Sequence, residues 1–91
     1  MGQFSLGKFH LTSKAITALA QAAQPLEQLL ARHENGDWGD SSAGETQDNE
    51  ESLLQGRRLR SVYTLKTGVR VQVITNWNRT LTTILLDSEE Y

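Results

Sequence analysis

The chain has 91 residues, a formal net charge of −2 and no cysteine. This length suits one domain with a single hydrophobic core. The absence of cysteine excludes disulfides and thiolate metal sites, and the small negative charge excludes a global field that would attract nucleic acid. The first ten residues lack the apolar run of a secretory signal, and apolar stretches stay far below the ~20 residues that span a bilayer. We therefore expect a cytoplasmic protein that does not enter a membrane.

The first predicted element is a strand. Residues 4–11 alternate between two faces, and Gly7 within them marks a bulge or a close backbone approach. Thr12 or Ser13 can then cap a helix. Apolar residues at i, i+3, i+4 and i+7 predict the side of this helix that faces the core: Ile16, Leu19, Ala20 and Ala23.

Pro25 is well placed to begin a second helix, which ends at Asn35-Gly36 because glycine suits a left-handed cap. Residues 40–47 are small and polar without a period, and they predict a mobile loop. Asp48 and Glu51 resemble a capping box and predict a short third helix closed by Gly56. The core-facing stripe of the second helix is Leu26, Leu29, Leu30 and His33.

From residue 58 the period changes to two. Residues 58–65 and 69–75 predict two strands joined by a tight hairpin turn, and residues 80–86, which are rich in β-branched side chains, predict a third. Closing the hairpin at Leu65 and Val69 places Tyr63 opposite Val71. The order β-α-α-α-β-β-β predicts an α+β fold in a single domain, residues 1–91. We expect an antiparallel sheet of three to four strands, with the helices packed on one side.

Several short segments spread along the chain form a pattern. They are Leu6-Gly7, Arg32-His33, Gly36-Asp37-Trp38-Gly39, Asn49, Leu53, Gly56, Arg58, Ser61, Tyr63, Ile74-Thr75, Arg79, Thr82-Thr83, Leu85-Leu86 and Glu90-Tyr91. Together they resemble a family of uncharacterised small bacterial proteins that are associated with plasmids and phages. The resemblance covers nearly the whole chain and implies a setting among accessory genes of mobile elements, with no established activity. In the turn before Arg79, this chain has Asn76-Trp77-Asn78 where the family pattern has acidic residues.

His33, Asp37 and Trp38 form the densest cluster of potentially functional side chains, and we treat them as a candidate binding corner. A catalytic role would make His33 a base oriented by Asp37, but no nucleophile accompanies them, so we assign no catalytic residue. A structural role is the favoured alternative. In that role His33 packs and bonds to the glycine-bracketed turn, Asp37 accepts from backbone donors, and the Trp38 N–H finds a carbonyl. With two histidines and scattered carboxylates, we expect no metal and no cofactor.

Charges are unevenly distributed along the chain. Seven acids and no base lie between residues 33 and 51, whereas five bases and no acid lie between residues 57 and 70. The two segments can neutralise each other, or the basic strands can meet an anionic partner. Our first functional hypothesis is a non-enzymatic module that binds a protein partner. The alternatives are a nucleic-acid-binding accessory protein and, third, a small hydrolase or nuclease at His33 and Asp37. The nucleic-acid alternative would use Arg58, Arg60, Arg70 and Arg79.

Overall fold

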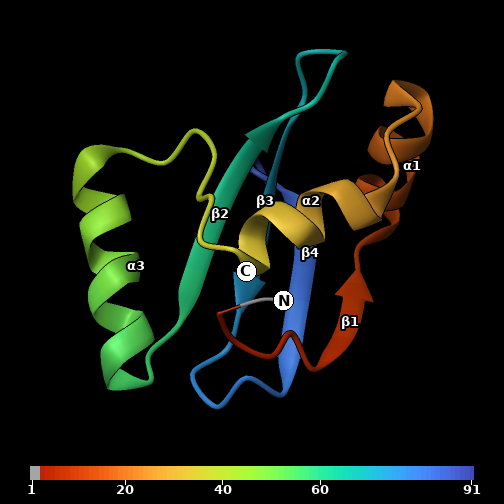
Figure 1. Ribbon diagram of the computed structural model, residues 1–91. Helices are drawn as coiled ribbons and strands as arrows, with labels where there is room; N and C mark the ends of the chain where they lie inside the picture. The colour runs from red at the N-terminus through yellow and green to blue at the C-terminus, as the bar shows by residue number, and fades with distance from the viewer. Residues whose placement is uncertain (1–2) are drawn as a thin grey trace.

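The computed structural model describes residues 3–91 (Figure 1). Within them, a four-stranded sheet in the order β1-β4-β3-β2 is accompanied by three helices. The α+β class and the predicted order of elements are confirmed. The elements are β1 (Lys8–Leu11), α1 (Ser13–Ala22), α2 (Leu26–Glu34), α3 (Ala43–Gln55), β2 (Leu59–Thr64), β3 (Arg70–Thr75) and β4 (Leu81–Leu86).

The sheet is mixed, so the prediction of an antiparallel sheet is wrong for one strand. β2, β3 and β4 form an antiparallel meander, and Tyr63 pairs with Val71 as the hairpin register predicts. β1 instead pairs with β4 in parallel, with Lys8 opposite Leu81. The direction of a pairing depends on the route of the chain through space, and the side-chain pattern of a four-residue strand does not encode that route.

β1 is shorter than predicted because the backbone turns at Gly7. This glycine has φ of +67°, and a Cβ built on it would lie 2.3 Å from the carbonyl carbon of Thr80. Only glycine accommodates both the left-handed conformation and this contact. The next amide, that of Lys8, donates to the Thr80 carbonyl at 2.9 Å. The close backbone approach predicted for Gly7 is therefore present, and the strand begins after it.

α1 and α2 enclose the main core against one face of the sheet. Thr12 caps α1 by accepting from the amide of Ala15. The predicted core stripe of α1 is wrong for three of its four residues, because Ile16, Ala20 and Ala23 are exposed and only Leu19 is buried. The buried stripe is displaced by one position toward the N-terminus, and Ile16 is 55% exposed. Alanine side chains allow α1 to lie close to the sheet, and a stripe of alanines has little hydrophobic contrast with its neighbours. The buried residues of the two helices are Ala15, Ala18, Leu19, Ala22, Leu29, Leu30 and His33.

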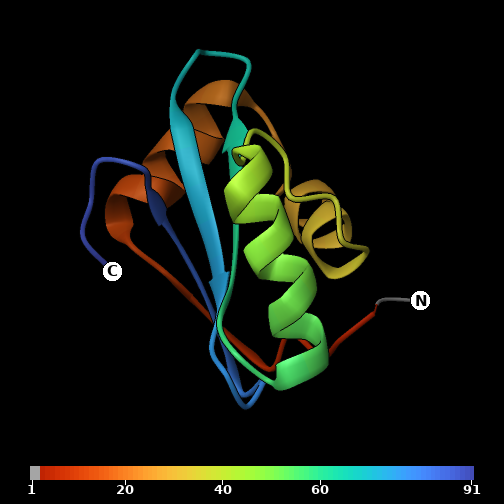
Figure 2. The same ribbon diagram turned by 90° about the vertical axis from the view of Figure 1, so that its left-hand side faces the viewer.

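α3 begins at Ala43, inside the segment 40–47 that the sequence predicts to be a loop. Ser42 and Glu45 form a reciprocal capping box, so the predicted box of Asp48 and Glu51 is wrong. Asp48 lies within the helix instead. α3 stands beside β2, at the opposite edge of the sheet from β1 (Figures 1 and 2). Its buried residues are Asn49 and Ser52, so α3 is held by polar contacts, which apolar periodicity does not reveal.

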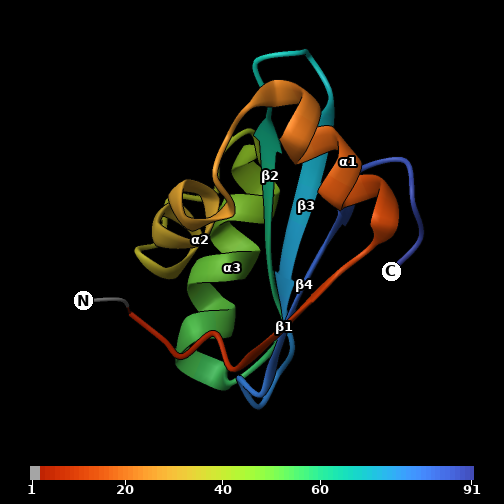
Figure 3. The ribbon, with the colours of Figure 1, turned by 90° about the vertical axis from the view of Figure 1, so that its right-hand side faces the viewer.

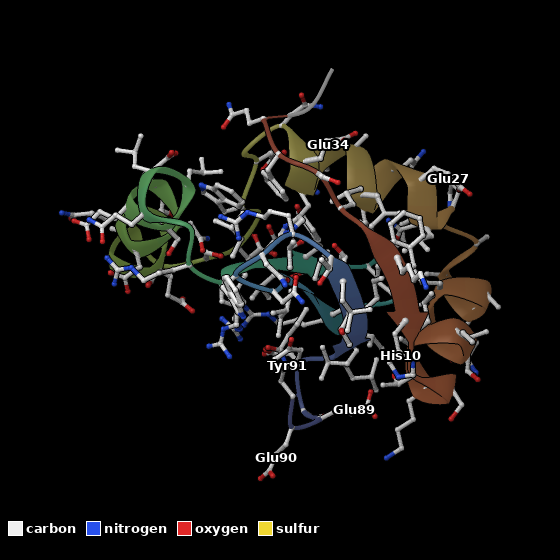
Figure 4. The ribbon with its side chains drawn as sticks, turned by 90° about the horizontal axis from the view of Figure 1, so that it is seen from below. His10, Glu27, Glu34, Glu89, Glu90 and Tyr91 are labelled. Atoms are coloured by element: carbon white, nitrogen blue, oxygen red, sulfur yellow. The ribbon has the colours of Figure 1, made fainter. Side chains whose placement is uncertain are left out.

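The second face of the sheet is crossed by side chains and by the C-terminal residues. Arg60 of β2 donates to Gln72 of β3 and to Asp87 beyond β4. The Gln72 amide in turn donates to the carbonyls of Leu86 and Glu89. Figure 4 shows the chain end, with Glu89 and Tyr91, on the side of the sheet away from α2. Val62, Ile74 and Leu85 are buried on this face.

Candidate functional site

α2 brings the His33 ring into the core, where it joins two strands. The ring is fully buried. Its Nδ1 lies 2.5 Å from the hydroxyl of Ser61 on β2, and its Nε2 lies 2.9 Å from the hydroxyl of Thr75 on β3. The sequence correctly predicts that His33 packs, but the prediction that the ring bonds to the turn after α2 is wrong. Both hydrogen-bond partners of the ring are on the sheet. They are far from His33 in the sequence, so no local sequence pattern predicts these two bonds.

The order of donors along this chain of hydrogen bonds fixes the tautomer of His33. The Thr82 hydroxyl donates to the carbonyl of Leu6 at 2.6 Å, so it accepts from the Thr75 hydroxyl at 2.8 Å. Thr75 has then used its proton and accepts from Nε2–H of His33. Nδ1 remains as the acceptor for Ser61. The His33 imidazole assigned from these hydrogen bonds is neutral, and each of its two nitrogens has a hydrogen-bond partner.

Burial, with a smaller contribution from the positive charge of Arg79, lowers the pKa of His33 to about 4. The desolvated ring disfavours a charge that its neighbours do not compensate. A general base must reach a proton on a substrate, and here both ring nitrogens contact protein hydroxyls. The geometry therefore favours a role for His33 in joining α2 to the sheet.

Of the other two residues of the predicted corner, Trp38 packs beside His33, whereas the Asp37 carboxylate is directed to Arg32 and Gly39. The Trp38 ring is buried 5.8 Å from the His33 ring and stacks on Phe4, and its N–H donates to the Glu50 carboxylate rather than to the expected carbonyl. Asp37 accepts from the amide of Gly39 as predicted. Its carboxylate also pairs with Arg32 at 2.7 Å, and the Arg32 guanidinium lowers the pKa of Asp37. The structure therefore brings His33 and Trp38 together in a buried centre and leaves Asp37 half-exposed beside Arg32.

Arg60, one of the four candidate nucleic-acid-binding arginines, is largely engaged with acids and amides of the chain. Its guanidinium pairs with Glu45 at 2.5 Å and with Asp87 at 3.1 Å. It also donates to Gln72 at 2.7 Å. The sequence allowed the acidic segment to neutralise the basic one. The ion pair between Arg60 and Glu45 is a contact of this kind.

Arg79 is committed to backbone carbonyls. It occupies a left-handed conformation with φ of +58°. From there it donates to Ser52 at the end of α3, to Arg57 and to Asn76. Arg79 thereby ties the β3–β4 turn to α3. The other two candidates, Arg58 and Arg70, are exposed, and Arg58 lies over the ring of Tyr91.

The outer edge of β2 is closed by hydrogen bonds from outside the sheet. The side chain of Asn49 on α3 makes the two hydrogen bonds that a neighbouring strand would make with Arg60. It accepts from the Arg60 amide at 3.0 Å and donates to the Arg60 carbonyl at 2.7 Å. The Val62 amide donates to Trp38, and the Val62 carbonyl accepts from Asp40. The Asp40 carboxylate also accepts from the amide of Thr64. Every outward-facing amide of β2 is thus paired.

Gly39 allows the loop to approach β2 this closely. It lies between Trp38 and Asp40 and forms a bridge with Val62, at a φ of +68°. A Cβ on Gly39 would lie 2.1 Å from the Val62 carbonyl oxygen and 2.6 Å from the Tyr63 ring. A glycine at position 39 is therefore needed for the loop to pair with the outer edge of β2. The sequence alone did not indicate this role.

The outer edge of β1 is open. The Lys8 amide donates to Thr80, just before β4, and the Thr12 amide donates to Ile84 of β4. The alternation of a strand then turns the backbones of Phe9 and Leu11 away from the sheet. Among residues 3–91, no partner is found for these outward groups. Phe9 is 50% exposed. In Figure 3, which faces this edge, α1 lies above β1 and no helix crosses in front of the strand.

Comparison of the chain with protein-family profiles, curated proteins and solved structures gave no match. The resemblance to plasmid- and phage-associated proteins therefore stays a prediction. Within residues 3–91, no helix is long and apolar enough to cross a membrane. Over the same residues, no three histidine or acidic side chains gather closely enough to hold a metal ion.

Proposed function

We propose that this protein is a non-enzymatic interaction module that binds an extended protein segment along the open edge of β1. The observation that carries the proposal is the contrast between the two edges of one sheet. β2 is closed by Asn49 and by the Trp38–Asp40 segment, whereas the backbone of β1 at Phe9 and Leu11 has no partner within residues 3–91.

Free strand edges pair readily with other strands, and proteins usually block them with charges, prolines, bulges or covering segments. An edge left open beside a protected one is therefore a feature to explain. Addition of a partner strand supplies main-chain hydrogen bonds for affinity, while exposed side chains supply specificity. Phe9 on β1 and Ile16 near the start of α1 are both exposed apolar side chains of the kind such a contact buries.

The nucleic-acid alternative has less support in the geometry. Two of its four arginines, Arg60 and Arg79, have their guanidinium groups directed to acceptors within the chain. Arg58 and Arg70 remain exposed, but two exposed arginines on a chain of net charge −2 make a weak electrostatic contact with phosphates. The hydrolase alternative would need a His33 nitrogen free to act on a substrate.

The test uses affinity capture from cells that carry the gene. The baits are the wild-type chain, Phe9→Pro, which removes an outward N–H, and Leu54→Ala, which alters a 90% exposed side chain on α3. We expect a specific protein to be retained by wild type and Leu54→Ala and lost with Phe9→Pro. Equal recovery by all three baits would contradict the proposal. An oligonucleotide mobility shift at low salt would instead favour the nucleic-acid alternative.

A further inference from the structure

We infer that a second copy of this chain can occupy the β1 edge, adding its own β1 in antiparallel fashion to form a symmetric dimer. This inference rests on the proposed function, because it names an occupant for the same edge. It follows from the residues that the edge presents and from the charges at its two ends.

The edge is complementary to itself when the two-fold axis passes beside His10. Antiparallel pairing about that axis places Phe9 directly opposite Leu11 of the second copy. These are the two residues whose amides and carbonyls face outward, so each pair can exchange both hydrogen bonds. Phe9 and Leu11 also lie on the same face of β1, because they are two residues apart. The pairing therefore sets an aromatic side chain beside an aliphatic one, a favourable cross-strand combination.

The charges at the ends of β1 match in the same register. Lys8 falls opposite Thr12 of the second copy. Within each chain the Thr12 hydroxyl donates to the Glu89 carboxylate at 2.7 Å, and the Leu86 amide donates to the same oxygen. The bond from the Leu86 amide, and then that from Thr12, lowers the pKa of Glu89 below its ordinary value. Each Lys8 ammonium thus meets a carboxylate that the other copy holds in place.

Glu89 lies on the side of β1 that this pairing requires. Figure 4 shows Glu89 and His10 on one side of β1, while Glu27 and Glu34 of α2 lie on the other side. Lys8, His10 and Thr12 share one face of the strand by alternation. In its own chain, Lys8 sits opposite Leu81 and Thr12 lies beyond Leu11 at the far end of β1. The contact between Lys8 and Glu89 is therefore one that only a second copy provides.

A pair of four-residue strands buries less than the ~800 Å² per partner of a standard stable interface. We therefore expect a weak dimer, with a dissociation constant on the order of 10–100 μM. Sedimentation velocity of the purified full chain over a wide concentration range measures it. Wild type and Leu54→Ala should shift from monomer to dimer alike, whereas Phe9→Pro should remain monomeric.

Phe9→Pro is tolerable in the monomer, because proline is accepted on an edge strand where its missing N–H faces outward. If this variant does not fold, Phe9→Ala replaces it and should raise the dissociation constant several-fold. A wild-type chain that stays monomeric at about 1 mM, far above the expected constant, would overturn the inference. So would a dimer that neither Phe9 variant weakens.

A double-mutant cycle tests the predicted register. Lys8→Gln and Glu89→Gln each remove both symmetry-related ion pairs, so each should weaken the dimer about two- to thirtyfold, and the double variant should add little to either. Independent effects that multiply would contradict this register. Failure of the inference is separable from failure of the proposed function. A monomeric chain that still captures a different protein through Phe9 keeps the function and loses only the second copy.

Discussion

At the scale of single residues, His33 makes the free energy of unfolding depend on pH. Its pKa of about 4 in the folded chain lies below the ordinary 6.5, so the unfolded chain takes up the proton first as pH falls. The stabilisation is complete above pH 6.5 and declines toward pH 4. Between about pH 7.5 and pH 5 we expect a loss of about 2 kcal/mol in urea unfolding. His33→Gln should abolish most of this dependence, and a wild-type stability that is flat over that range would contradict the account.

Trp38 is the largest side chain at the corner beside His33, and its ring is buried against Phe4. Trp38→Ala should lower the free energy of unfolding by ~3–5 kcal/mol, because it leaves a cavity and unpairs Glu50. Thermal and urea unfolding measure the change. An unchanged melting temperature together with lost partner binding would show that the corner is a binding site rather than a structural centre.

Arg60 and Arg70 offer a matched pair on the same face of the β2–β3 hairpin. Arg60 joins Glu45, Gln72 and Asp87, whereas the Arg70 side chain is exposed. Arg60→Ala should cost about 1–2 kcal/mol in urea unfolding, since several charge-assisted bonds are lost in a partly exposed network. Arg70→Ala should change stability by less than about 0.5 kcal/mol. Equal effects of the two substitutions would rule out this assignment.

At the scale of elements, the start of α3 separates two capping assignments. Ser42→Ala removes the observed cap and should cost about 1 kcal/mol. Asp48→Ala removes the residue that the sequence alone suggested as the cap, and it should change stability by less than about 0.5 kcal/mol because Asp48 lies inside the helix. A larger loss for Asp48→Ala would mean that the helix begins later than Ala43.

Elements with strong periodicity were predictable from the sequence, and elements held by polar contacts were not. The β2–β3 hairpin and its register follow from alternation and from the turn at Gly68. The first turn of α3 was not predicted, because the buried residues of this helix are the polar Asn49 and Ser52 and form no apolar stripe. The His33 ring was placed in the core correctly, but Ser61 and Thr75 lie 28 and 42 residues away along the chain. The parallel pairing of β1, and with it the identity of the open edge, depends on the path of the chain through space.

At the scale of the whole molecule, the fold treats its two sheet edges differently. β2 is closed by α3 and by the turn that precedes it, while β1 faces outward beneath α1 (Figures 1 and 3). The same C-terminal segment that crosses the second face also holds Glu89 beside the end of β1. One small sheet thus has a closed edge at β2 and an open edge at β1. We propose that the partner binds at the β1 edge.

Residue-resolved amide hydrogen exchange of the wild-type chain at low micromolar concentration tests this contrast most directly. The amides of Arg60, Val62 and Thr64 have partners outside the sheet, so they should exchange slowly, near the rate set by unfolding. The outward amides of Phe9 and Leu11 should exchange orders of magnitude faster, and should slow as the concentration rises and the dimer forms. Protected Phe9 and Leu11 amides in the dilute monomer, or fast exchange along β2, would contradict the account.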